Sequence, residues 1–321
     1  MTQPPYSITP EVIRHVAAIS EKIGRINAAY LDKPTPQLRK ENRIQTIHSS
    51  LAIEGNTLTT DQITALMESK RVIGPKKDVN EVLNAIKVYE QVHEFEPDSS
   101  TAFLRAHRML MEGLVSDNGK YRKKGVGIMA GDRLAHLAPP ANNVPYLMKE
   151  LFRYLKVSKE IALIKSCVFH YEMEFIHPFS DGNGRMGRLW QTLILMKEYP
   201  VFEFIPFENL IRESQRDYYK ALAKSDAAGN STPFIVYMLD VIDKTLQDML
   251  QYKSRVFTAE DRLQYFYENG LTPFNRGDYM NVFKDISSAT ASRDLQHGVA
   301  LGYFKKVGDK TKTLYYRVKR K

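Results

Sequence analysis

Residues 177–188 read His-Pro-Phe-Ser-Asp-Gly-Asn-Gly-Arg-Met-Gly-Arg, so an imidazole, a carboxylate and two guanidiniums surround a glycine-rich loop. An imidazole accepts a proton near neutral pH, and a carboxylate is a good oxygen ligand for Mg²⁺. Guanidiniums and backbone N–H groups at a helix start hold phosphate oxygens. The segment therefore predicts a loop that binds a nucleotide polyphosphate with a metal ion and deprotonates an attacking group.

Each polar position of this loop has a candidate role. His177 is the candidate base, with a structural histidine as the alternative, and Asp181 is the candidate Mg²⁺ ligand, with a helix cap as the alternative. Gly182, Asn183 and Gly184 allow backbone N–H groups to approach an anion closely. The loop is not a P-loop, because no Gly-x-x-x-x-Gly-Lys-Ser/Thr sequence is present.

Arg185 and Arg188 are three residues apart and therefore share one helix face. They require an anionic partner, which is a polyphosphate, a carboxylate elsewhere in the chain, or each at different times. Phe179 is expected to anchor the loop in the core. His170 shares a helix face with Glu174 and His177, but its spacing is not that of a zinc motif, which favours a structural hydrogen bond.

Apolar residues at helical spacing dominate the chain around this loop. Thr9, Pro10 and Glu11 form a helix start signal. Further helices are predicted around 44–51, 80–95, 101–114, 161–175 and 186–196, and the loop joins the last two.

The exception is a predicted β-hairpin from Val126 to Leu137, with Gly131 and Asp132 at its turn. A lone hairpin is weakly stable unless it is packed or used. Its exposed edge is suited to pairing with an extended peptide, and a simple connection is the alternative.

The pattern changes in residues 258–321, where three helices and a two-stranded ribbon follow one another. This order predicts a winged helix-turn-helix. The segment carries twelve Lys/Arg against seven Asp/Glu. DNA binding, protein binding, dimerisation and a merely solvated basic surface remain open for it.

The 321 residues suffice for two or three domains, and the formal net charge is +9. The sequence has no apolar stretch of the ~20 residues that a membrane span needs. The N-terminus lacks the pattern of an export signal, and Cys167 is the single cysteine, expected to be buried and inert. We therefore expect a cytoplasmic protein with no membrane segment.

Residues 177–188 resemble the signature of the Fic family, His-Pro-Phe-x-(Asp/Glu)-Gly-Asn-Gly-Arg-x-x-Arg, at every fixed position. The resemblance implies transfer of AMP from ATP to a protein hydroxyl, with His177 as base and Asp181 holding Mg²⁺. The intact Gly-Asn-Gly-Arg favours AMP transfer over the phosphorylation carried out by relatives of the Doc type. The hairpin would be the family's flap, which docks the target as an added strand. Implied ATP-binding residues are Gly182, Asn183, Gly184, Arg185, Met186, Gly187, Arg188, Tyr218, Tyr219 and Asn230; for the two tyrosines, helix packing is the alternative.

A second motif, Ser50-Leu-Ala-Ile-Glu54-Gly55, is similar to the family's inhibitory pattern (Ser/Thr)-x-x-x-Glu-(Gly/Asn). Its spacing places Ser50 and Glu54 on one face of a helix. The resemblance implies that Glu54 pairs with Arg188 and keeps that guanidinium from the γ-phosphate of ATP.

The sequence thus predicts a mainly α protein with a Fic-type helical bundle, a β-hairpin flap and a C-terminal winged helix. The expected regions are 1–100 with the inhibitory motif, 101–250 as catalytic core and 258–321. Removal of AMP, with Glu54 orienting water, and a DNA-binding regulator with an accessory Fic domain are the alternative functions. Self-modification and a homodimer are further expectations that the sequence leaves open.

Overall fold

The computed structural model describes residues 4–29, 36–130, 133–254, 259–283, 286–308 and 313–318. The chain divides into two units, Met1–Leu250 and Gln251–Lys321, and each is described by itself. The predicted hairpin turn at 131–132 and the basic residues 319–321 lie outside the described residues.

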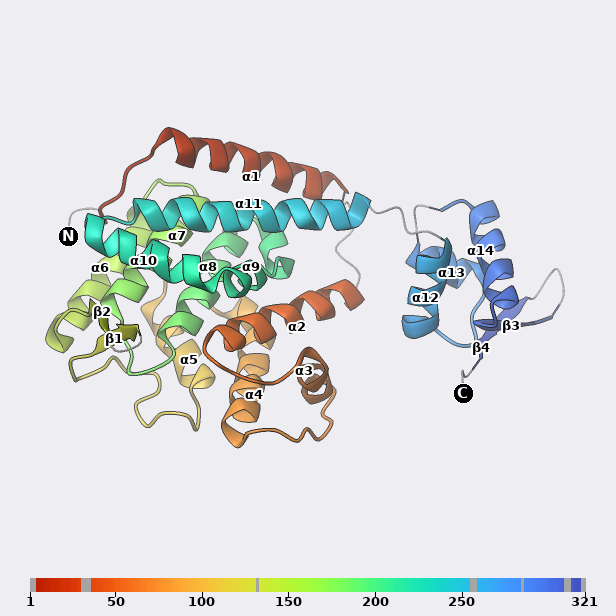
Figure 1. The fold of residues 1–321 in the computed structure, drawn as a ribbon, viewed down its shortest axis with the longest axis horizontal. Helices are drawn as coiled ribbons and strands as arrows, with labels where there is room; N and C mark the ends of the chain where they lie inside the picture. Colours follow the sequence, from red (N-terminus) through yellow and green to blue (C-terminus); the bar gives the residue numbers. More distant parts are fainter. Residues whose placement is uncertain are drawn as a thin grey trace. The chain divides into compact units, whose positions relative to one another are not determined.

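The first unit is mainly helical, as predicted, and contains one described β-hairpin (Figure 1). Its α-helices are α1 (Pro10–Ala29), α2 (Pro36–Ile53), α3 (Thr60–Met67), α4 (Lys76–Glu90), α5 (Ser100–Leu110), α6 (Val144–Val157), α7 (Ala162–Ile176), α8 (Asn183–Glu198), α9 (Glu208–Glu213), α10 (Gln215–Ala228) and α11 (Thr232–Ser254). Short 3-10 helices are η1 (Val92–Glu94), η2 (Ala141–Asn143) and η3 (Pro200–Phe204). No described helix is long and apolar enough to cross a membrane.

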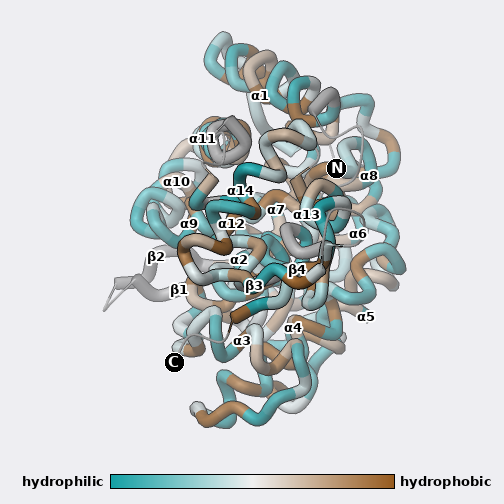
Figure 2. The backbone as a smooth tube through the Cα atoms, turned by 90° about the vertical axis from the view of Figure 1, so that its right-hand side faces the viewer, coloured by the Kyte–Doolittle hydropathy of each residue, from teal (hydrophilic) through white to brown (hydrophobic). Residues whose placement is uncertain are grey.

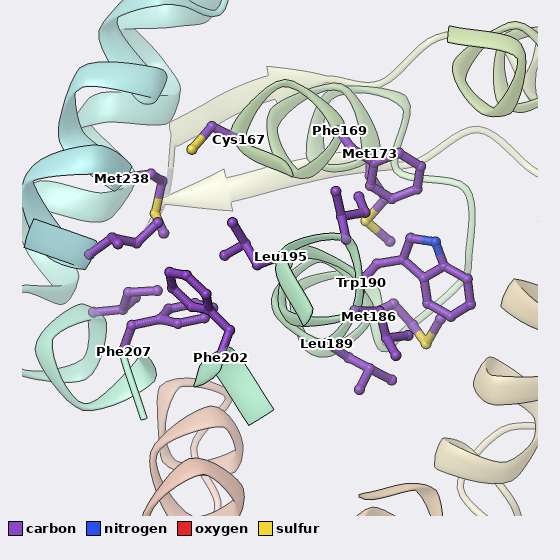
Figure 3. Packing of buried hydrophobic residues seen from close by; sticks show 14 of the residues in the cluster. Cys167, Phe169, Met173, Met186, Leu189, Trp190, Leu195, Phe202, Phe207 and Met238 are labelled. Atoms are coloured by element: carbon purple, nitrogen blue, oxygen red, sulfur yellow. The ribbon is translucent and has the colours of Figure 1, made fainter. Parts of the chain in front are cut away.

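Helices α7 and α8 pack against each other at the centre of this unit and carry its most deeply buried side chains. Trp190 and Met186 of α8 and Phe169 and Met173 of α7 gather in the core (Figure 3). The Trp190 indole N–H donates to Pro97 O at 2.8 Å, so this large ring is also satisfied by a hydrogen bond. Cys167 is fully buried, and burial raises the pKa of its thiol to about 12.

Hydrophobic and hydrophilic residues alternate along the surrounding helices, which is the pattern that buries one helix face (Figure 2).

The predicted start of α1 is confirmed, since the Thr9 hydroxyl accepts the N–H of Val12 at 3.3 Å. Helix α1 runs beside α11 (Figure 1), and Lys22 of α1 forms an ion pair with Asp243 of α11 at 2.7 Å. One continuous hydrophobic core extends from α1 to α11. The boundary proposed at residue 100 therefore stays a prediction.

The predicted hairpin forms antiparallel strands β1 (Gly127–Ala130) and β2 (Arg133–Leu137). The pairing starts with Gly127 opposite Leu137 and shifts by one residue between Ile128 and Met129. Such a bulge increases the local twist of a two-stranded ribbon.

The second unit contains α12 (Ala259–Asn269), α13 (Arg276–Val282), α14 (Ser288–Ala300), β3 (Phe304–Val307) and β4 (Leu314–Arg317). Strands β3 and β4 are antiparallel, and Phe274 forms an isolated bridge with Tyr315 of β4. A small core lies between these elements, and Arg262 of α12 binds Asp294 of α14 at 2.6 Å within it. The described order of elements is the one that the sequence predicts for this segment.

Candidate active site

Residues 177–182 connect the end of α7 to the start of α8. His177 directly follows α7 with a φ of 49°, a left-handed conformation that is uncommon for residues other than glycine. The Asn183 side chain closes the loop, because it accepts from Phe179 N at 2.9 Å and donates to Phe179 O at 3.0 Å. Phe179 is fully buried, as predicted. These contacts fix the backbone that carries His177.

His107 of α5 supports this loop from the core, and the sequence analysis did not identify it. Its ring stacks on Phe179 with centroids 3.5 Å apart and an interplanar angle of 4°. Its Nδ1 accepts the N–H of Gly119 at 2.8 Å, so Nε2 carries the proton and donates to Asp181 O at 3.0 Å. Burial lowers the pKa of His107 to about 4, which keeps the ring in this neutral form.

The N-terminus of α8 offers backbone N–H groups of the kind that hold an anion. Gly182, the residue before the helix, is left-handed (φ 85°) and supplies no side-chain cap, so the first backbone N–H groups of α8 lack an intrahelical partner. Asp181 therefore does not cap α8. A Cβ on Gly184 would collide with Glu54 Oε1 and Arg188 Nη1. The Glu54 carboxylate thus lies against the helix start, where the helix dipole favours negative charge.

Arg188 is fully buried and contacts the segment that carries the second motif. Its Nη2 donates to Glu54 Oε1 at 2.7 Å, across 134 residues of sequence, and this is the pair that the second motif implies. Its Nε donates to Ser50 Oγ at 3.1 Å and its Nη2 to Ser50 O at 2.9 Å. Burial opposes the charged form, but the Glu54 carboxylate raises the pKa of Arg188 above its usual value. Arg188 Nη1 is buried without a partner among the described residues.

Arg185 is held by two carboxylates. Its Nη1 donates to Glu81 Oε1 of α4 at 3.0 Å, and its Nη2 donates to Asp181 Oδ1 at 2.9 Å. Glu81 also accepts from Asn56 Nδ2 at 2.9 Å, which links it to the turn after Glu54. Arg185 Nε is buried with no partner in the described part of the chain. Glu81 was missed by the sequence analysis, since nothing in the sequence around it marks a site.

The donor set at Asp181 fits a magnesium ion that arrives with a phosphate ligand. The Asp181 side chain is 47% exposed, and its Oδ1 also accepts the N–H of Gly182 at 2.6 Å. Mg²⁺ is often bound by one or two carboxylates and completes its sphere with phosphates and water. The described residues contain no cluster of three or more His, Cys, Asp and Glu that would hold an ion alone. Asp181 is therefore suited to a metal shared with a substrate.

The remaining implied ATP-binding residues differ in what they offer a ligand. Met186 is buried, and its N–H bonds Gly182 O at 3.0 Å. Tyr218 is 2% exposed with its hydroxyl 3.1 Å from His170 Nε2, whereas Tyr219 is 49% exposed. The Asn230 side chain accepts from Thr232 N at 3.1 Å at the start of α11. Their roles at the nucleoside stay predictions.

We expect Gly187→Ala to destabilise the protein by about 1–3 kcal/mol, because overpacking a filled core has that cost. A Cβ on Gly187 would lie 2.7 Å from His170 Cδ2 and 3.2 Å from Glu174 Oε1. Urea unfolding measures the difference. The matched control is Gly24→Ala in α1, where a Cβ meets nothing within 4 Å, and this variant should be at least as stable as wild type. Equal stability of both variants would exclude the tight packing at Gly187.

We expect His170 to make the folded protein less stable in acid. Its Nδ1 lies 2.6 Å from Gln191 Oε1, and burial lowers the pKa of the ring from 6.5 to about 3. Between these values the unfolded chain binds a proton that the folded protein does not, so stability is complete above pH 6.5 and falls as the pH decreases. His170→Gln removes this dependence, by up to about 1.4 kcal/mol per pH unit. Urea unfolding at pH 7.5 and pH 5 gives the free energy of unfolding at each pH. Its decrease from pH 7.5 to pH 5 should be smaller for His170→Gln than for wild type, and equal decreases would show that His170 is not the cause.

Comparison with known proteins identifies this arrangement. Residues 97–195 match the Fic/DOC family. The whole chain resembles the crystal structure of a Fic family protein from Desulfovibrio desulfuricans G20, with 40% identity, a TM-score of 0.78 and 99% of each chain covered. The chain belongs to the Fic family. The family match covers the His177–Arg188 loop together with α5, α6 and α7.

Two further similarities place this Fic protein among its relatives. Fic-1 from C. elegans (residues 134–508) has the same fold, with a TM-score of 0.62, 22% identity and coverage of 76% of this chain and 72% of that one. The protein named "Protein adenylyltransferase Fic" from Drosophila erecta is 30% identical over 222 residues, which are 65% of this chain and 42% of that protein. This Fic protein therefore spans less than half the length of that curated relative.

Proposed function

We propose that this Fic protein transfers AMP from ATP to the hydroxyl of a Ser, Thr or Tyr side chain of a target protein and releases pyrophosphate. The observation that carries the proposal is the pair of buried guanidiniums, Arg185 and Arg188, beside the start of α8. Each has one nitrogen with no hydrogen-bond partner in the part of the chain that the structure describes. The relatives named adenylyltransferases support it.

In the proposed reaction His177 accepts the proton of the attacking hydroxyl. The hydroxyl oxygen forms a bond to the α-phosphorus as the bond to the bridging oxygen breaks, and pyrophosphate leaves with its electron pair. The α8 N-terminus and both arginines hold phosphate oxygens in place. When bound, Mg²⁺ neutralises phosphate charge, and Asp181 is the residue that would hold it.

We further propose that Glu54 inhibits this reaction. Its carboxylate contacts Arg188 at 2.7 Å and lies against Gly184, which are the groups that would receive ATP phosphates. Two anions cannot occupy one cationic pocket without strong repulsion, so ATP phosphates bind productively only when Glu54 moves away.

The target is proposed to dock along the β1–β2 flap by strand addition, which uses unpaired backbone groups of an edge strand. The protein itself is one candidate target, and a homodimer would bring a second copy to the flap.

Parallel reactions with ATP labelled at the α- or the γ-phosphate test the proposal. The Glu54→Gly variant and a cell lysate supply enzyme and targets. Kinases of the lysate transfer the γ-phosphate by themselves, so the label that counts is the excess over a parallel reaction with Glu54→Gly/His177→Ala. We expect this excess label on protein only from α-labelled ATP. Excess label from γ-labelled ATP instead would show phosphorylation, and would overturn the proposed AMP transfer.

The reverse activity, removal of AMP from a modified protein, uses the same residues with Glu54 orienting a water molecule. The Glu54 carboxylate lies against Gly184 at the start of α8, and this position supports AMP removal as the second candidate function. Release of AMP from purified modified protein by wild type, but not by Glu54→Gly, would support removal as the main direction.

A DNA-binding regulator is the alternative function from a different class. Exposed polar and basic residues of the second unit support it. The proposed winged helix exposes Ser288 and Arg293 on α14 and Lys305 and Lys306 on β3. Retention of duplex DNA that falls steeply with salt would support this alternative, and no retention at low salt would exclude it.

A further inference from the structure

Arg122 precedes the flap and has an unusual set of partners. The residue is 3% exposed, and among the described residues its guanidinium donates to four backbone carbonyls. These are His177 O from Nε at 2.7 Å, Lys124 O from Nη1 at 2.8 Å, and Pro139 O at 2.6 Å and Ile176 O at 3.3 Å, both from Nη2. An arginine buried this deeply normally faces a carboxylate, yet no described carboxylate forms an ion pair with it.

One half of these contacts holds the end of α7. The last carbonyls of a helix lack an intrahelical partner, and a positive charge there is favourable. Arg122 bonds three consecutive carbonyls, since its own N–H donates to Pro178 O at 2.9 Å. The middle one belongs to His177, whose left-handed backbone needs support from its surroundings. Arg122 thus fixes the backbone conformation on which the position of the imidazole depends.

The other half holds both ends of the flap. Lys124 lies three residues before β1, and Pro139 lies two residues after β2. A two-stranded hairpin has little stability of its own. Because both its entry and its exit bond the same guanidinium, the flap is attached to the residue that also holds His177.

We infer that Arg122 is a positioning residue that sets the distance between a flap-docked hydroxyl and the His177 base. This inference rests on the proposed function. A planar guanidinium reaches four carbonyls at once, whereas a lysine ammonium donates from a single point. Misplacement of reacting groups by about 1 Å costs on the order of 10²-fold in rate. The α8 anion site has no bond to Arg122 among the described contacts, so ATP binding should not depend on it.

The first test measures hydrogen exchange of the full chain without nucleotide, for wild type, Arg122→Gln and Arg122→Lys. We expect at least about tenfold faster exchange in peptides covering 124–139 and 176–183 in Arg122→Gln, and no change in 259–318. Arg105→Lys, which alters an exposed arginine paired with Glu94, is the control. Faster exchange spread evenly over α4–α8, or none at all, would overturn the inference. Arg122→Lys keeps the test valid if Arg122→Gln does not fold.

The second test adds the same substitutions to Glu54→Gly and measures AMP incorporation into lysate proteins from α-labelled ATP. We expect a loss of about 10²-fold for both variants, with ATP affinity by calorimetry within about twofold of the parent. A parallel loss of ATP affinity would indicate a merely structural residue, and unchanged labelling would exclude positioning. A Glu54→Gly parent that labels nothing would contradict the proposed function instead, and hydrogen exchange would still decide whether Arg122 holds loop and flap together.

Discussion

Glu54→Gly should raise the rate of AMP incorporation by roughly 10- to 100-fold, the scale of coupling between an inhibitory and a productive state. The substitution removes the carboxylate that bonds Arg188 Nη2 at 2.7 Å and lies against Gly184. Arg188 remains buried and charged, so the vacated pocket keeps its attraction for phosphate. The measurement is the initial rate of transfer from α-labelled ATP to lysate proteins.

Two controls separate loss of inhibition from a general change in stability. Glu54→Gln keeps the size of the side chain but removes its charge, so it should activate partially. Glu68→Ala removes a carboxylate that pairs with Lys40 of α2 and with Lys70, which follows α3. This variant should incorporate AMP at the rate of wild type. Activation of Glu68→Ala to the same extent would contradict a specific role of Glu54.

His177→Ala in the Glu54→Gly background should reduce AMP incorporation by about 10²- to 10⁴-fold, the usual contribution of a general base. His177 lies in the loop that α7, α8 and Asn183 hold, whereas the groups proposed to bind phosphate belong to α8. ATP affinity measured by calorimetry should therefore change little.

The matched control for this variant is His93→Ala, which removes a histidine whose side chain is 65% exposed and lies 3.1 Å from Glu203. It should keep full activity. If His177→Ala loses ATP binding together with labelling, the role of His177 is to bind the nucleotide or to hold the loop, and the base assignment is wrong.

The local parts of the site could be read from the sequence because their residues are adjacent. The order of base, carboxylate, glycines and arginines in 177–188 determines a loop followed by a helix start, and hydrophobic periodicity placed α7 and α8 on either side. Glu54 and Arg188 are 134 residues apart, and only the resemblance to a family connected them before the structure.

Residues that act by holding backbone could not be predicted, since a hydrogen bond to a carbonyl imposes no pattern on the sequence. Arg122 reaches Ile176 from 54 residues away and His177 from 55, and His107 reaches Asp181 from 74 residues away. Glu81 of α4 pairs with Arg185 of α8 across 104 residues of sequence. The sequence also did not separate α9, α10 and α11; α9 and α10 begin without a side-chain cap.

We propose that the groups at the start of α8 bind either Glu54 or the phosphates of ATP, and that His177 acts on the hydroxyl that attacks the bound ATP. Transfer of label from α-labelled ATP to protein, compared among wild type, Glu54→Gly and Glu54→Gly/His177→Ala at equal ATP, tests it most directly. We predict weak labelling by wild type, at least tenfold stronger labelling by Glu54→Gly, and none above background for the double variant. Equal labelling by wild type and Glu54→Gly would contradict the account.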